Sequence, residues 1–311
     1  MVTVRKTLFG VVAAAVLSLP GVAAAQEYET KVVAKNLKRP TGVAVDLRGQ
    51  VYFTELPTPG VGGGDGGKNT VNVLNPKNGR IRNLTTGEPE PTNLATNFLG
   101  DVYWTCKSAG VILSLEGGRG VAQLVAGGLD KPSGMAAYPF GPALYFTEVP
   151  TPGVSGANGG RNKVYAFLEG IDLEFLLDDG DPQPSDVAVD LFGDVYWTCT
   201  SAGVIVKLSG GTTEVIARDL DRPYGIATDY MGNLYFTEVP TPGVSGAKGG
   251  KNKVSKLKLS TGAITVIDEG DPDPFDVTVE PYGSTVYWTC RSAGVIVETK
   301  LKPKPKPKPK R

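Results

Sequence analysis

One stretch of this chain occurs three times, and the repetition limits what the chain can fold into. The sequence LYFTEVPTPGVSGANGGRNKV at positions 144–164 recurs with few changes at 51–71 and 234–254. A shorter theme, VYWTCKSAGVI at 102–112, alternates with it and recurs at 195–205 and 286–296. Because YFTE and YWTC are variants of one motif, six related units follow one another as A-B-A-B-A-B. Such units bury their apolar faces against their neighbours, which favours one repetitive domain over the two that 311 residues suggest.

The spacing of the units predicts their architecture. Corresponding positions of successive A-B pairs lie 90 to 93 residues apart, so one unit has about 45 residues, the length of a four-stranded propeller blade. Short runs rich in Val, Ile, Tyr, Phe, Trp and Thr, separated by Gly, Pro, Asn and Asp, are typical of strands. In the fifth unit we expect strands over 225–229, 233–238, 253–259 and 263–268. The sequence therefore predicts an all-β, six-bladed β-propeller.

The two ends of the repeat predict how the ring closes. Residues 31–37 (KVVAKNL) resemble 215–220 (VIARDL), an outermost strand, but no inner strands precede them. The last unit stops after its third strand, near Thr299. We therefore expect the first strand to complete the sixth blade, which removes exposed sheet edges, and we place the propeller domain at 26–299.

The segments outside the repeat differ from it in composition. Residues 1–25 have a basic start, an apolar core over 8–19 and a small-residue cleavage site at 23–25, as in a secretory signal peptide. A membrane anchor is the alternative, but the apolar run is shorter than the roughly 20 residues that a span needs, and no later stretch could span. The protein is therefore expected to be secreted, and extracellular, periplasmic or cell-wall-associated.

Residues 300–311 alternate Lys with Pro, which predicts an extended, disordered tail. This tail is either a spacer or a contact to anionic cell-wall or surface polymer. Two of the 32 basic residues lie in 1–25 and seven in the tail, so 26–299 has a net charge of −9. An acidic body argues against nucleic-acid binding.

The three cysteines, Cys106, Cys199 and Cys290, occupy the same position in the three B units. Exported chains ordinarily pair their cysteines. Here at least one intervening sheet separates them, and packed sheets lie about 10 Å apart, whereas a disulfide needs Cα atoms within about 7 Å. We therefore expect three unpaired, buried thiols.

Residues 223–238 (PYGIATDYMGNLYFTE) resemble a repeat of the NHL and streptogramin-lyase-like group of six-bladed propellers, which is related to the SMP-30 proteins, and the match recurs at 40–55. The resemblance implies the fold but no single activity, because such propellers include lyases, lactonases and plain binding modules. The lyases of the group rely on histidine, and this chain has none. Calcium-dependent lactonases use carboxylates and asparagines at the channel mouth, although their E-G-P-x-W opening is missing here.

Acidic and proline-rich segments precede the first strand of each B unit, at 88–93 (EPEPTN), 181–186 (DPQPSD) and 271–276 (DPDPFD). They end in Asn93, Asp186 and Asp276, which replace the glycines found at this position in the A units (Gly42, Gly134 and Gly225). Three oxygen ligands would then face the axis from alternate blades, an arrangement that suits Ca²⁺. Alternatively, these side chains cap turns and loop N–H groups. The glycines are explained either by tight packing or by close approach of a ligand.

The long loops that follow YFTE should open on the face where one blade connects to the next. Their Gly and Pro residues favour close backbone approach and a low ordering entropy, so this face is expected to bind a ligand or partner, whether a small molecule, a glycan or a protein. Recent duplication is the alternative explanation of their near-identity. The candidate binding residues are Glu55, Glu148, Glu238, Asn69, Asn162 and Asn252. No phosphate-loop motif is present.

Taken together, the sequence predicts an exported, monomeric propeller that acts as a binding scaffold through its long-loop face, without histidine-dependent catalysis. Two alternatives stay open. One is a calcium-dependent hydrolase or lactonase that acts through Asn93, Asp186 and Asp276 with a nearby glutamate of an A unit. The other is a structural cell-surface protein attached by its cationic tail.

Overall fold

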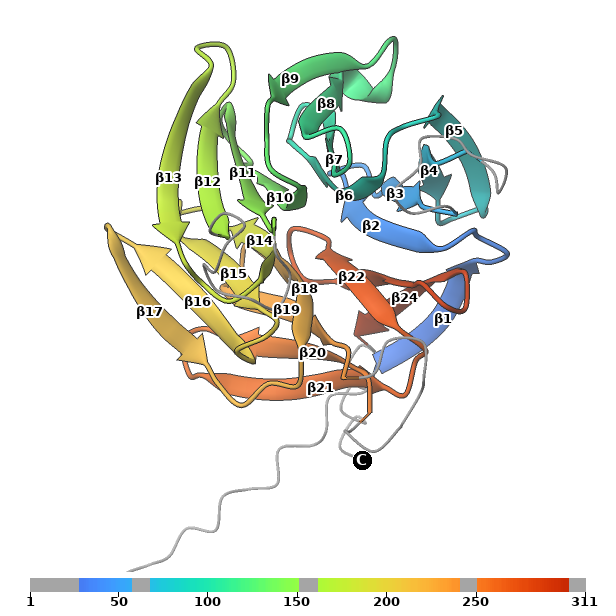
Figure 1. The fold of residues 1–311 in the computed structure, drawn as a ribbon. Helices are drawn as coiled ribbons and strands as arrows, with labels where there is room; N and C mark the ends of the chain where they lie inside the picture. The colour runs from blue at the N-terminus through green and yellow to red at the C-terminus, as the bar shows by residue number, and fades with distance from the viewer. Residues whose placement is uncertain (1–27, 58–67, 151–161, 241–250, 302–311) are drawn as a thin grey trace, which may run out of the picture.

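The computed structural model describes residues 28–57, 68–150, 162–240 and 251–301, and their strands form six four-stranded antiparallel sheets around one axis (Figure 1). The fold predicted from the sequence is confirmed. Blade 1 consists of β2 (Pro40–Val45), β3 (Val51–Glu55), β4 (Thr70–Asn75) and β5 (Arg80–Thr86). Blade 2 consists of β6 (Pro91–Thr96), β7 (Val102–Cys106), β8 (Val111–Leu115) and β9 (Gln123–Gly127), with a short 3₁₀ turn, η1 (Glu116–Gly118), between the last two.

The next three blades repeat this order. Blade 3 consists of β10 (Pro132–Ala137), β11 (Ala143–Glu148), β12 (Lys163–Leu168) and β13 (Leu173–Asp179). Blade 4 consists of β14 (Pro184–Val189), β15 (Val195–Cys199), β16 (Val204–Ser209) and β17 (Thr212–Ala217). Blade 5 consists of β18 (Pro223–Thr228), β19 (Asn233–Glu238), β20 (Lys253–Lys258) and β21 (Ala263–Glu269), each within about two residues of its predicted bounds.

Blade 6 is built from both ends of the chain. Its strands are β22 (Pro274–Val279), β23 (Thr285–Cys290), β24 (Val295–Leu301) and, outermost, β1 (Tyr28–Ala34), which pairs antiparallel with β24. Strand β1 lies about three residues before the predicted 31–37, because the chain already turns inward where the Leu37 N–H donates to the Gly294 carbonyl at 2.9 Å. The equivalent bonds in blades 2 and 4 join Leu129 to Gly110 and Leu220 to Gly203.

The innermost strands pack closely around the axis, and the glycines of the A units make this possible. A Cβ atom on Gly42 would lie 2.7 Å from Asn93 Cα, and one on Gly225 would lie 2.7 Å from Asp276 Cα. Gly134 meets Asp186 in the same way. Each glycine is therefore in contact with the backbone of the next blade, which supports the packing interpretation.

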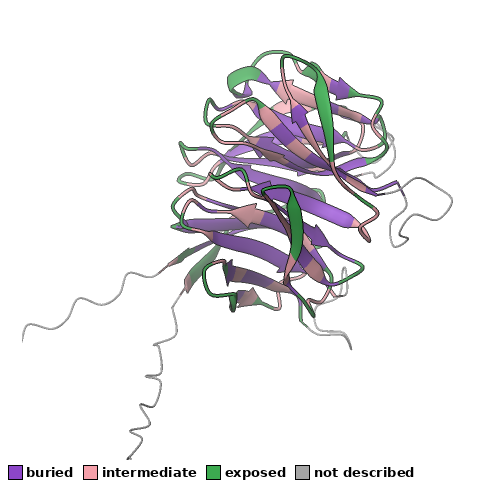
Figure 2. Cartoon of the chain, turned by 90° about the vertical axis from the view of Figure 1, so that its left-hand side faces the viewer, coloured by how far each residue is buried: buried purple, intermediate pink, exposed green. Residues whose placement is uncertain are grey.

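The core lies between the blades. The side chains of Trp104, Trp197 and Trp288 are fully buried, and each packs within a cluster of apolar side chains from adjacent blades. Figure 2 shows the buried strands in the middle of the molecule and the exposed residues toward its outer turns and strands. Within the described residues, no helix is long and apolar enough to cross a membrane.

Candidate functional site on the propeller axis

The long-loop face is the face of the ring at which β3, β11 and β19 end, at Glu55, Glu148 and Glu238. The pairing of Pro40 with Glu55, and of Glu55 with Thr70, puts the start of β2 and the start of β4 on this same face. The predicted gathering of the loop ends and the connections between blades is thus present. The tips of the long loops, including most of each PTPGV segment, lie outside the described residues.

The three glutamates bind backbone N–H groups at the long-loop face. In each A blade, the carboxylate accepts a hydrogen bond from the connection that precedes its blade: from Lys38 N to Glu55 (2.6 Å), from Asp130 N to Glu148 (2.7 Å) and from Asp221 N to Glu238 (2.9 Å). Glu148 and Glu238 are buried, and burial raises the pKa of Glu148. These contacts give the glutamates a structural role, and direct contact with a ligand stays a prediction.

The three asparagines fasten each A blade to the following B blade. Their side-chain amides donate to the carbonyls of Glu88, Asp181 and Asp271 at 3.1 to 3.2 Å, and all three asparagines are fully buried. In addition, the N–H groups of Gly87, Gly180 and Gly270 donate to the asparagine carbonyls. Asn69, Asn162 and Asn252 therefore lie beneath the long-loop face and set the course of the A-to-B connection.

The acidic residues that begin each A-to-B connection are partners of the cysteines. Trp197 Nε1 donates to Asp181 at 2.6 Å, and the Cys199 thiol faces the same carboxylate at 3.4 Å. The same triad recurs as Trp104, Cys106 and Glu88, and as Trp288, Cys290 and Asp271. The cysteines are free and buried, and burial with the adjacent carboxylate raises the pKa of each thiol.

The predicted metal residues do meet on the axis. Each of them is the third residue of its innermost strand: Asn93 in β6, Asp186 in β14 and Asp276 in β22. All three line the channel that runs along the axis. The Asn93 amide donates to the Asp186 carboxylate at 2.9 Å, and the carboxyl groups of Asp186 and Asp276 interact with each other. We call this group the axial cluster.

The two carboxyl groups of the axial cluster also bind backbone N–H groups of neighbouring blades. Asp186 accepts from Val187 N and Ile226 N, both at 2.9 Å, and Asp276 accepts from Val277 N at 2.8 Å and Val43 N at 2.7 Å. The alternative interpretation expected these residues to bind turn and loop N–H groups, whereas the N–H groups that they bind belong to the innermost strands. Each carboxylate joins the innermost strands of two blades.

The axial carboxyl groups are almost completely buried and have no ion-pair partner among the described residues. Asp186 is 2 % exposed and Asp276 is 3 % exposed. Among the ion pairs of the described residues, none includes either of them. Burial raises the pKa of Asp186 to about 7, and burial together with the charge of Asp186 raises the pKa of Asp276 well above its usual range. The pair therefore retains a proton near neutral pH.

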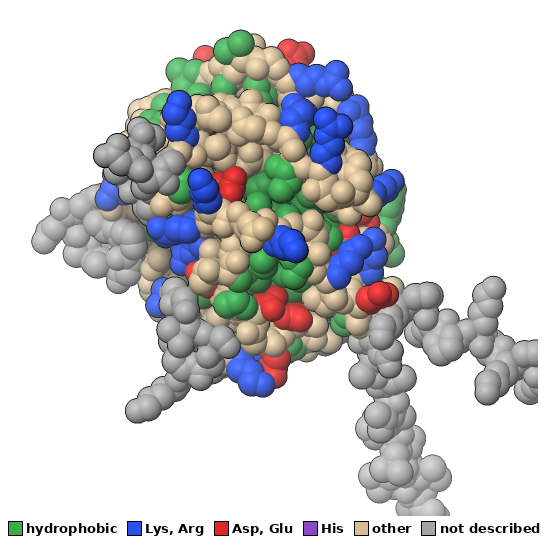
Figure 3. Space-filling model, turned by 90° about the vertical axis from the view of Figure 1, so that its right-hand side faces the viewer, with side chains coloured by type: hydrophobic (Ala, Val, Ile, Leu, Met, Phe, Trp, Pro, Cys, Tyr) green, Lys and Arg blue, Asp and Glu red, His purple; other side chains and the backbone are tan. Residues whose placement is uncertain are grey.

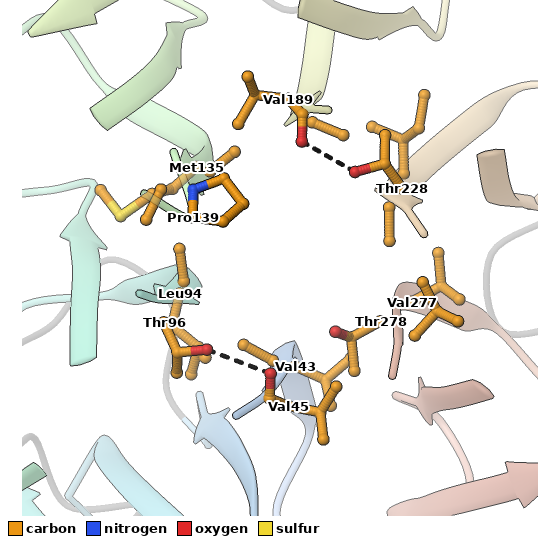
Figure 4. Close-up of a pocket in the computed structure, with 18 of the residues that line it drawn as sticks. Val43, Val45, Leu94, Thr96, Met135, Pro139, Val189, Thr228, Val277 and Thr278 are labelled. Atoms are coloured by element: carbon orange, nitrogen blue, oxygen red, sulfur yellow. Dashed lines mark hydrogen bonds between the residues drawn. The ribbon is translucent and has the colours of Figure 1, made fainter. Parts of the chain in front are cut away.

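A channel of about 150 Å³ extends from the axial cluster along the innermost strands. Figure 4 shows its labelled side chains arranged around an open centre, among them Val43, Leu94, Met135 and Val277, with Thr96 and Thr228 bonded to neighbouring blades. The walls thus combine apolar side chains with threonines, and the lining carboxyl groups are those of Asp186, Asp276 and Asp46. On the long-loop side of the cluster, the Tyr224 and Phe275 rings lie 4.2 Å apart between centroids.

The comparisons with known proteins concern the fold. No family model matches the chain, and no curated protein matches it. A gluconolactonase from Xanthomonas campestris has 15% identity and a TM-score of 0.70, over 91% of this chain and 94% of that one. A putative gluconolactonase has 12% identity and a TM-score of 0.66, over 88% of this chain and 92% of its own. Virginiamycin B lyase from Staphylococcus aureus has 17% identity and a TM-score of 0.58, over 89% and 100%.

At these identities the likeness establishes architecture alone. It agrees with the resemblance of residues 40–55 and 223–238 to the repeat of this group. The chain thus has the six-bladed β-propeller fold that the gluconolactonases and streptogramin lyases also have.

Proposed function

We propose that this protein is an exported binding propeller that presents its long-loop face to a ligand or partner and binds calcium at the axial cluster. The observation that carries the proposal is the convergence of Asn93, Asp186 and Asp276 from alternate blades. The two carboxyl groups are buried, and neither forms an ion pair with a Lys or Arg of the described residues. Burying such groups costs free energy unless a ligand or proton neutralises them. Carboxyl groups that have a shifted pKa and lie at a channel are typical of binding sites.

The residues of the axial cluster fit calcium in chemical type. Two carboxylates and one amide oxygen are donors of the type that Ca²⁺ prefers. In the structure the Asn93 oxygen accepts from Leu94 N at 2.5 Å while the amide nitrogen faces Asp186, so binding of the ion requires this amide to turn over. In the described part of the chain, no group of three or more His, Cys, Asp and Glu side chains is placed to hold a metal, so the amide of Asn93 has to serve as the third ligand. Ca²⁺ takes six to eight oxygens, and the remaining positions would be filled by water or by the bound ligand.

A calcium titration with a thermal-unfolding readout tests the proposal. Ligand linkage predicts about 2.7 kcal/mol of stabilisation when the free ion is at a hundred times its Kd. We expect Ca²⁺ to raise the unfolding temperature of the wild type and not that of Asp276→Asn. Glu269→Gln, which removes an exposed carboxylate paired with Lys251, is the matched control and should respond like the wild type. No stabilisation in millimolar Ca²⁺ would exclude the site.

The second candidate function is a calcium-dependent hydrolase or lactonase. Its support is the fold shared with gluconolactonases, together with carboxyl groups at the channel. A histidine-to-alanine variant of virginiamycin B lyase is catalytically inactive, and this chain has no histidine, which argues against that lyase chemistry. Hydrolysis of a panel of sugar lactones, measured with and without Ca²⁺, separates enzyme from scaffold. Turnover that disappears in Asp276→Asn but not in Glu269→Gln would favour the enzyme.

A further inference from the structure

The face of the ring opposite the long-loop face has an unusual concentration of exposed apolar side chains. In every blade the turn that joins the first strand to the second lies on this face. The two residues at the tip of each turn are apolar or aromatic, with Arg48 of blade 1 as the exception. The exposed side chains of these turns are Leu47, Phe98, Leu99, Phe140, Phe192, Met231 and Tyr282, with Phe192 90% and Tyr282 76% exposed. Val121 and Ile171, in turns between third and fourth strands, are exposed on the same side. We call this the apolar face.

The other exposed large hydrophobic side chains of the described residues lie on outer strands, such as Leu173, Phe175 and Leu176 on β13, and none lies on the long-loop face. Single exposed hydrophobic residues are normal on protein surfaces, whereas a contiguous apolar patch marks a site of interaction. The gathering of exposed apolar turns on one face is therefore informative.

The apolar side chains are held in fixed positions. In blade 4, Asp190 accepts hydrogen bonds from Phe192 N at 2.8 Å and Asp194 N at 3.0 Å, and Asp46, Asn97 and Asp229 form the same turn in blades 1, 2 and 5. Aromatic rings also contact one another across blades: Phe98 with Phe140, Phe140 with Tyr230, and Tyr230 with Tyr282, at centroid distances of 5.9 to 6.2 Å. A rigid surface loses little entropy on docking.

Both ends of the described chain lie at the apolar face. Tyr28 pairs with Leu301, and Lys300 pairs with Thr285, the first residue of β23, directly after the turn that carries Tyr282. Beyond Leu301 the sequence continues as KPKPKPKPKR, with six basic residues. A hollow beside Leu47 and Tyr282 is lined by four basic residues, Lys31, Arg48, Lys77 and Lys300, and by three acidic ones, Asp46, Glu280 and Glu298. Lys31 and Lys300 form ion pairs with Glu298. Figure 3, which views the ring from its rim, shows lysine and arginine side chains distributed over the outside of the molecule.

We propose that the apolar face docks on an anionic lipid bilayer, with the exposed Phe, Tyr, Leu and Met side chains in the interfacial layer. Aromatic and aliphatic side chains are the residues that enter this layer, and each Lys or Arg near an anionic surface contributes about 1 kcal/mol. Acidic residues more than about 8 Å from the membrane are screened at physiological salt, whereas Asp46, Asp190 and Asp229 lie in the apolar turns themselves and weaken the attraction. The long-loop face would point away from the membrane and stay free for a partner.

Vesicle co-sedimentation of the full chain without residues 1–25 tests the proposal. We expect binding to vesicles of equal phosphatidylglycerol and phosphatidylcholine, and at least about tenfold weaker binding to phosphatidylcholine alone. Deletion of 302–311 should weaken binding about tenfold or more and reduce its salt dependence. The triple variant Phe192→Ser, Met231→Ser, Tyr282→Ser should also weaken it about tenfold or more, because apolar area no longer leaves water.

A matched variant changes three exposed apolar residues in the middle of outer strands, away from the apolar face: Phe175→Ser, Leu176→Ser, Val266→Ser. It should bind like the wild type, and unfolding curves would verify that both triple variants are folded. In a separate readout, the fluorescence of Phe192→Trp should shift to the blue on anionic vesicles, and that of Leu176→Trp should not. The proposal is wrong if vesicle binding is absent, if it survives the triple variant on the apolar face, or if the protein binds soluble anionic polymer but not vesicles.

Discussion

At the residue scale, the two axial carboxyl groups connect folding to pH. The pKa of Asp186 in the folded protein is about 7, against an ordinary value of 3.8. A carboxyl group whose pKa is raised by folding stabilises the fold below its unfolded pKa, and this stabilisation is lost as pH rises through the folded pKa. We therefore expect the unfolding temperature to fall by about 5 °C between pH 5 and pH 8. Asp178 and Asp268, whose pKa values are raised to about 6, contribute in the same direction.

The variant Asp276→Asn isolates the contribution of the axial pair. It removes one of the two like charges but leaves Val43 N or Val277 N without its acceptor, so the variant should be less stable than the wild type at pH 5. Its deficit should shrink toward pH 8, where the wild type carries the uncompensated charge. Calorimetry across this range measures the gap between the two unfolding temperatures. Parallel curves would show that the pair does not titrate in this window.

The three thiols should be inert in the folded protein. Burial and the neighbouring carboxylates keep the cysteines protonated at pH 8, and the thiolate is the reactive form. Alkylation by iodoacetamide should therefore be at least about a hundredfold slower in the native protein than in denaturant, where mass spectrometry should detect three labels. An exposed thiol introduced as Ser260→Cys is the positive control. Rapid native labelling at Cys106, Cys199 or Cys290 would contradict the buried triad.

The residues of the axial cluster could be predicted from sequence because they replace glycine at one position of a regular repeat. Their hydrogen bonds between blades could not, because Ile226 N and Val43 N are far away in sequence, Val43 N being 233 residues away from Asp276. The roles of Glu148 and Asn162 were equally hidden, since a conspicuous polar residue at a loop looks the same whether it meets a ligand or the chain's own backbone. In the sequence, only the proline at the start of each blade indicated how the backbone runs between blades.

At the element scale, the spacing of the innermost strands depends on glycine. A methyl group on Gly134 would overlap the backbone of Asp186, which cannot move without shifting blade 4. Gly134→Ala should therefore destabilise the protein by about 3 kcal/mol or prevent folding. Gly127→Ala is the matched control, because its new methyl group would meet Val111 at 3.8 Å, an ordinary contact. Denaturant unfolding compares the two, and similar stabilities would show that the innermost strands can separate without cost.

The strands themselves were largely predictable, because β-branched and aromatic runs alternate with turn residues over a fixed period. The connections were not. The residue before the first proline of each blade, such as Lys131 or Gln183, has a positive φ, and its carbonyl accepts from the residue that follows the second strand. Nothing in these side chain types indicates a left-handed conformation. It follows from the pairing of the first two strands, which is a tertiary constraint.

At the scale of the whole molecule, the ring gathers residues that are far apart in sequence. The apolar pairs in the six turns are unremarkable one at a time, and only the circular arrangement puts them on one face with the ends of the chain. This surface was therefore invisible in the sequence, although the six-bladed ring that creates it was predicted.

Ring closure by β1 is the last property that belongs to the whole molecule. Without β1, the edge of β24 would be unpaired and blade 6 would lose its outermost strand, so each blade next to the gap would lose support. Deleting residues 26–37 should lower the unfolding temperature by about 10 °C and broaden the transition. A peptide of residues 26–37 added in trans should restore stability in proportion to its concentration, because it binds the folded ring. Deleting 302–311 is the control and should leave unfolding unchanged. If the shortened protein melts like the wild type and ignores the peptide, the sixth blade does not hold the ring together.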